Sequence, residues 1–135
     1  MRRNLHWAAA LLALSGCAVT PSPQDLAAED SYRSSIPTCS TAKECEAKFA
    51  AARNWMLANC GFRLQTVTAD YLETFKSGDY ADTSLYCRVT KTPISETAYR
   101  IELVAGANNP LMHSRAKLVS IHQGFNDTVN ASWQR

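Results

Sequence analysis

The most regular run of apolar side chains lies between Thr41 and Gly61 and has the spacing of one face of a helix. Its members are Cys45, Phe49, Ala52, Met56 and Cys60. Thr41 and Glu44 stand at the two positions of a capping box, which satisfies early amide groups of a helix. Gly61 suits the left-handed conformation that often follows a helix. The pattern therefore predicts a helix that runs to about Asn59.

Four later segments alternate apolar and polar residues with the period of a strand. They cover residues 62–68, 71–76, 85–90 and 99–105. One apolar face per strand is typical of an antiparallel sheet that is covered on one side only. Cys87 falls at an inward-facing position of the third segment.

A second apolar stripe at helical spacing follows the strands and consists of Leu118, Ile121, Phe125 and Val129. Asn109 is expected to cap this helix, with Pro110 at its first position. Together the patterns predict an α+β fold in a single small domain over residues 38–135. Its order is α-β-β-β-β-α, with a four-stranded antiparallel meander packed by two helices and held by two disulfides.

Residues 17–37 have a different composition, rich in Ser, Pro and Ala with charges of both signs. Such a segment cannot bury enough apolar surface to offset the cost of ordering it. We therefore expect a flexible tether here, with at most a short helix near residues 25–29.

The first residues have the layout of an export signal. Arg2 and Arg3 precede an apolar stretch of eight residues, Trp7–Leu14, whereas a membrane-spanning helix needs about 20. The stretch fits the apolar part of a secretory signal peptide, which is removed on export.

The run Leu14-Ser15-Gly16-Cys17 resembles the lipobox of bacterial lipoproteins. The resemblance implies that residues 1–16 are removed and that Cys17 is lipidated, and two or more acyl chains anchor a protein firmly. The residue after this cysteine is Ala18 and not Asp, and in this the sequence resembles lipoproteins that are sorted to the outer membrane. The expected location is therefore the inner leaflet of that membrane, facing the periplasm. The alternative is an ordinary signal peptide with a chance cysteine.

The charge balance argues against one class of partner. The chain has fourteen Lys and Arg against twelve Asp and Glu. Arg2 and Arg3 account for the excess, so the mature chain is formally neutral and contains no basic run. This argues against nucleic-acid binding.

With Cys17 lipidated, four cysteines remain, which indicates two disulfides in an exported domain. The predicted helix restricts their pairing. Cys45 and Cys60 would lie about 22 Å apart along it, whereas bridged Cα atoms lie about 4.4–6.8 Å apart. Cys39 lies near the far end of the helix from Cys60. A continuous helix thus leaves Cys39–Cys45 and Cys60–Cys87, and a break in it would reopen the choice.

The sequence contains no catalytic motif. His113 and His122 are nine residues apart and lack the spacing of a metal-ligand pair. The acidic pairs considered for catalysis or calcium are Asp70/Glu73 and Asp79/Asp82. They lie in turn-like segments without the spacing of a calcium loop. We therefore expect no metal, no cofactor and no enzymatic activity. A small envelope enzyme, with perturbed titratable groups near either histidine, is the alternative.

The outward-facing strand positions form the candidate partner-binding surface. They include Arg63, Tyr86, Arg88, Arg100 and Glu102. Arg and Tyr are enriched at the energetic centres of protein interfaces. The simpler interpretation is a solvated face with cross-strand charge pairs such as Arg88 with Glu102.

These patterns predict a lipid-anchored envelope protein that binds another protein or supports an assembly. The alternative is an inhibitor or immunity lipoprotein that neutralises a toxin or a cell-wall hydrolase.

Overall fold

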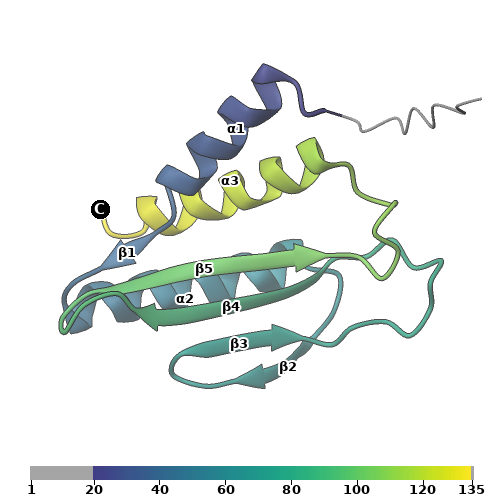
Figure 1. Cartoon of the computed structure of the whole chain (residues 1–135). Coiled ribbons are helices and arrows are strands. Elements are labelled where there is room, and N and C mark those ends of the chain that lie inside the picture. Colours follow the sequence, from purple (N-terminus) through teal and green to yellow (C-terminus); the bar gives the residue numbers. More distant parts are fainter. Residues whose placement is uncertain (1–19, 135) are drawn as a thin grey trace, which may run out of the picture.

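The computed structural model describes residues 20–134, which form three helices and a five-stranded antiparallel sheet (Figure 1). The predicted signal segment and the run that resembles a lipobox, with Cys17, lie outside the described residues. The elements, in chain order, are α1 (Pro23–Ser34), β1 (Thr38–Cys39), α2 (Ala42–Asn59), β2 (Leu64–Val67), β3 (Tyr71–Thr74), β4 (Tyr86–Pro93), β5 (Tyr99–Gly106) and α3 (Arg115–Ala131). No helix in this part of the chain is long and apolar enough to cross a membrane.

The sheet has the order β1-β5-β4-β3-β2, and every neighbouring pair is antiparallel. The predicted α+β fold and the meander of β2 to β5 are confirmed. The fifth strand, β1, was not predicted, because two residues are too few to show a period. In Figure 1, β1 extends the sheet beyond β5, at the edge opposite β2.

The helices α2 and α3 share one core with one side of the sheet. This core consists of Cys39, Cys45, Ala52, Met56, Cys60, Leu72, Cys87, Val89, Ile101, Leu103, Phe125 and Val129. The ring of Phe125 on α3 meets the ring of Trp55 on α2 edge-on, at 5.3 Å between centroids. The strand residues that alternate with the core positions face away from the helices, so the other side of the sheet is open.

Helix α2 has the predicted extent. The Thr41 hydroxyl accepts a hydrogen bond from the Glu44 amide at 3.2 Å. The Glu44 carboxylate accepts from the Ser40 amide at 2.9 Å, one residue before the position that a capping box predicts. This carboxylate also pairs with Lys48 at 2.9 Å, and Lys48 donates to the carbonyl of Thr38 at 2.7 Å. The start of α2 is therefore tied to β1.

The expected left-handed conformation of Gly61 is wrong. The chain leaves α2 in an extended conformation at Cys60 (φ −94°, ψ 137°), and no described glycine has a positive φ. Glycine is required here for space, because a Cβ on Gly61 would lie 2.5 Å from the Cβ of Ser84. The Gly61 amide donates to the Leu85 carbonyl at 3.0 Å, which holds this close approach.

Both predicted disulfides are confirmed. Cys39–Cys45 joins β1 to the start of α2, with 5.1 Å between Cα atoms. Cys60–Cys87 joins the residue after α2 to β4, with 6.1 Å between Cα atoms. The two bridges therefore fasten both ends of one helix to the sheet.

Helix α3 begins five residues later than predicted, at Arg115, with Ser114 as its N-cap. The Asn109 side chain instead accepts a hydrogen bond from the Leu111 amide at 3.0 Å. Asn and Asp commonly stabilise a turn by bonding to the backbone two residues on, and this competes with capping a helix. The predicted stripe is confirmed further along α3, where Phe125 and Val129 are fully buried.

Helix α1 occupies part of the segment for which a flexible tether was predicted. Ser22 and Asp25 form a reciprocal capping box and Pro23 stands at the first helical position. The helix buries none of its own residues and lies along α3 (Figure 1). Polar contacts hold it there, such as the bond from the Asn126 amide to the Tyr32 carbonyl at 2.8 Å.

Candidate functional site

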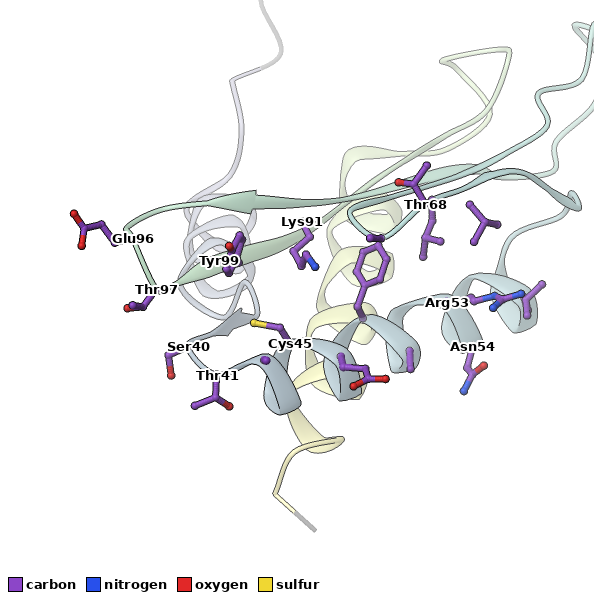
Figure 2. Close-up of a pocket in the computed structure, with 18 residues that line it drawn as sticks. Ser40, Thr41, Cys45, Arg53, Asn54, Thr68, Lys91, Glu96, Thr97 and Tyr99 are labelled. Atoms are coloured by element: carbon purple, nitrogen blue, oxygen red, sulfur yellow. The ribbon is translucent and has the colours of Figure 1, made fainter.

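A groove with a volume of about 950 Å³ lies between α2 and the sheet (Figure 2). Its origin is incomplete coverage. The two helices pack on each other, and within the sheet α2 contacts mainly β1, β4 and β5 and α3 contacts mainly β5. The helix-facing side of the β2–β3 hairpin therefore has less above it than the rest of the sheet, and the groove opens there.

The walls of the groove are largely apolar. From α2 they include Phe49, which belongs to the core-facing stripe, and Ala50 and Leu57, which lie beside that stripe. The floor includes the cross-strand partners Val67 and Leu72. Leu72 is 1% exposed and Val67 is 50% exposed, so the floor rises from the core to the solvent-facing edge.

Lys91 supplies a cation to the floor of the groove (Figure 2). Its Nζ lies 2.7 Å from the Asp70 carboxylate and 5.5 Å from the ring centroids of both Phe49 and Tyr99. Only 17% of the Lys91 side chain is exposed. The ion pair and the two aromatic faces compensate for the water that this ammonium has lost.

The two ends of the groove carry opposite charges. Figure 2 shows Arg53 and Asn54 at one end and Glu96 and Thr97 at the other. Glu46 lies on α2 two turns before Arg53 and also lines the groove. Neither Arg53 nor the two glutamates form an ion pair with any described residue. These charges are therefore available to a ligand.

The structure places the five predicted partner-binding residues on the open side of the sheet. In the register of β4 and β5, Tyr86, Arg88, Glu102 and Arg100 all alternate with core positions. Arg63 precedes β2, and its guanidinium lies 5.8 Å from the ring centroid of Phe75. We call this side, with Phe75 and Val104, the open face.

Charges on the open face are not paired as expected. Arg88 lies directly opposite Val104 on β5 and Glu73 on β3, whereas Glu102 lies opposite Thr90. The suggested pair of Arg88 with Glu102 is therefore not a direct cross-strand pair. Arg63, Arg88 and Arg100 form no ion pair with any residue between 20 and 134.

The two histidines lie apart from the groove. The Nε2 atom of His113 lies 3.0 Å from the carbonyl of Thr83. The Nδ1 atom of His122 lies 2.7 Å from the carbonyl of Leu118, and its ring packs at 5.3 Å from the Tyr32 ring. Each histidine therefore has a local structural partner.

Three of the four acidic residues considered for catalysis or calcium have local partners. Asp70 pairs with Lys91. Asp79 and Asp82 accept bonds from the amides of Ala81 and Ser84, each at 2.8 Å. The Ser84 amide lowers the pKa of Asp82 below its usual range. Within residues 20–134, no three His, Cys, Asp or Glu side chains come together as metal ligands.

The groove was not predicted from the sequence. A signal was present, because Ala50 and Leu57 widen the apolar arc of α2 beyond the stripe that contains Phe49. An apolar arc wider than one helix face needs an additional surface to cover it.

No family model, curated protein or solved structure matches this chain.

Proposed function

We propose that this protein is a non-enzymatic lipoprotein of the bacterial envelope that binds another protein through the open face. The observation that carries the proposal is the group of three arginines, Arg63, Arg88 and Arg100, which have no ion-pair partner among the described residues. Beside them Phe75 is 45% exposed and Val104 is 39% exposed. Arginine and aromatic side chains together are typical of interface centres.

The partner expected on this face carries an acidic patch around an apolar centre. Unpaired arginines attract a complementary negative surface and fix its orientation. Phe75 and Val104 would supply the apolar area that excludes water from the contact. The strands beneath are held by the hydrogen bonds of the sheet, so the surface needs little ordering when it binds.

The anchor is proposed from the lipobox resemblance, which rests on residues outside those described. Lipidation at Cys17 would hold the domain at the inner leaflet of the outer membrane, facing the periplasm. Cells fed an alkyne fatty acid should label the unaltered protein and not a Cys17→Ser variant. An unlabelled wild-type protein would remove the anchor from the proposal and leave the open face to be tested alone.

Partner binding is tested by purifying the full-length protein from crosslinked membranes. The Arg88→Glu/Arg100→Glu variant should lose a stoichiometric partner that the wild type retains. A Lys43→Glu/Lys117→Glu variant has the same change in net charge at exposed helix positions and should retain it. Equal recovery with both variants would reject the open face as the binding surface. A toxin or wall hydrolase as the partner would favour an inhibitor over an assembly factor.

A further inference from the structure

The groove beside α2 has the length of a short extended peptide. Its apolar and polar wall runs along α2 from Ala42 to Leu57. Fifteen helical residues span about 22 Å, and an extended chain advances about 3.3 Å per residue. The groove is therefore about as long as seven residues of a strand.

Polar groups along the groove distinguish a polypeptide from an acyl chain. Thr97, Thr68 and Asn54 follow one another from one end of the lining to the other, and Glu46 also lines the groove from α2. The backbone of a bound peptide has an amide or a carbonyl to satisfy at every residue. A fatty-acid chain has polar atoms at one end only and could not pair with polar side chains along the whole groove.

The apolar part of the groove suits side chains that alternate along a strand. Phe49, Leu57 and Val67 lie along the groove, with Tyr99 near the Glu96 end. Successive side chains of an extended chain point in opposite directions. Every second residue of an occupant could therefore enter the groove, while the others would face the solvent.

Charge gives the occupant a direction. Glu46 and Glu96 would attract a basic side chain, and Arg53 at the other end would attract an acidic one. Lys91 at the centre already pairs with Asp70 and does not need an acidic ligand. We propose that the groove binds an extended polypeptide segment of about seven residues, in which apolar side chains alternate with polar ones between a basic and an acidic end. This site is separate from the open face.

A set of defined peptides tests the proposal. The probes are fluorescein-labelled heptapeptides with blocked termini. They have the pattern KTXTXTE or the reversed pattern ETXTXTK, where X is Leu, Val, Ile, Phe or Tyr. Fluorescence anisotropy with the purified, disulfide-bonded chain should show saturable binding of members of one direction. Fluorescein-labelled palmitate serves as the lipid probe in the same assay.

Matched variants locate the binding. Arg53→Glu should weaken the best peptide by about tenfold or more, as expected for loss of one charge-assisted contact, and a KTXTXTK peptide should recover affinity for that variant. Ala50→Arg should block the groove, whereas Ala58→Arg, at an exposed position of α2 outside the lining, should bind normally. Urea midpoints of all variants verify that each one folds.

The outcomes separate the two proposals. Arg88→Glu/Arg100→Glu should bind the peptides as the unaltered chain does, so failure of the open face would not affect this site. The proposal would be overturned if no peptide bound. It would also be overturned if Arg53→Glu and Ala50→Arg bound the peptides as tightly as the unaltered chain does. Saturable binding of palmitate without any peptide binding would overturn it too and identify a lipid site.

Discussion

Lys91 and Arg88 lie three residues apart on β4, on opposite sides of the sheet, and their charged groups have different surroundings. Lys91 is on the helix-covered side, where it pairs with Asp70 and stacks between two aromatic rings. Arg88 is on the open face, exposed and without an ion-pair partner in residues 20–134. A desolvated cation needs partners within the fold, whereas a solvated one is left available for contacts with another molecule.

The same contrast extends to what holds the two sides together. On the covered side the core residues, the two disulfides and the hydrogen bond from Lys48 to the Thr38 carbonyl join α2 to the sheet. On the open face Arg88, Arg100 and Glu102 lie on strands without a packed layer above them. Stability should therefore depend mainly on the covered side, and binding on the open face and the groove.

The largest expected effect is the loss of the bridge that closes the far end of α2. Cys60→Ala/Cys87→Ala should lower the free energy of unfolding by about 3–4 kcal/mol, because this disulfide closes a loop between residues that are 27 positions apart. Cys39→Ala/Cys45→Ala releases a separation of six and should cost about 2 kcal/mol. Urea unfolding measures both. Equal losses would show that loop length does not govern the contribution of these bridges.

Truncating one side chain on each side of the sheet should change the free energy of unfolding by different amounts. Leu72→Ala removes a side chain that is 1% exposed and should destabilise the fold by about 3 kcal/mol. Val104→Ala, on the open face, should change the free energy of unfolding by less than about 0.5 kcal/mol. Chemical denaturation of both variants makes the comparison. A cost of more than about 1 kcal/mol for Val104→Ala would mean that the open face is packed rather than free.

A smaller effect concerns Glu44. Its bond with Lys48, followed by the Ser40 amide, lowers the pKa of the Glu44 carboxyl below its ordinary value of 4.5. A carboxyl whose pKa is lower in the folded state than in the unfolded state stabilises the fold at pH values above the unfolded-state pKa. This stability is lost as the pH falls through the folded-state pKa. Glu44→Gln should therefore be less stable than the wild type by about 1 kcal/mol at pH 7.

The difference between Glu44→Gln and the wild type should close as the pH falls below 4.5. Urea midpoints measured from pH 7 to about pH 2 follow this change. Glu102→Gln, on the open face, is the control and should change stability at pH 7 by less than about 0.5 kcal/mol. A Glu44→Gln difference that stayed constant across the range would contradict the role of the charged pair.

The smallest effects distinguish the two sets of charges directly. A double-mutant cycle on Lys91 and Asp70 should give a coupling of about 0.5 kcal/mol, since Asp70 is 64% exposed. The cycle on Arg88 and Glu73, which are opposite in register but form no ion pair, should give less than about 0.2 kcal/mol. Lys91→Gln, Asp70→Asn, Arg88→Gln and Glu73→Gln serve as the single variants. A larger coupling on the open face would show that its arginines are already engaged.

Much of the framework followed from local patterns. Helix α2 was predictable because its apolar positions repeat over about four turns and the helix begins with a capping sequence. Once that helix was continuous, its length excluded the other disulfide pairings. The alternation in β4 and β5 placed Arg88, Arg100 and Glu102 on one side, because side-chain direction in a strand follows directly from the period of two.

Other features depended on partners that local patterns do not reveal. Helix α1 has little apolar surface to bury, and its docking rests on Asn126, Gln123 and Asn130 of α3, about ninety residues further along the chain. The requirement for glycine at position 61 depends on Ser84, which approaches only after the sheet forms. The start of α3 was misplaced because Asn109 can stabilise either a turn or a helix end.

By itself, the sequence determined the α+β class, the long helix, both disulfides and the identity of the outward-facing arginines. Periodicity and covalent reach decide these, and both are properties of the local chain. The groove was decided only by the tertiary structure, because it arises where two helices do not cover the whole width of the sheet. A cavity is the space that the packed elements leave between them, and that depends on all of them together.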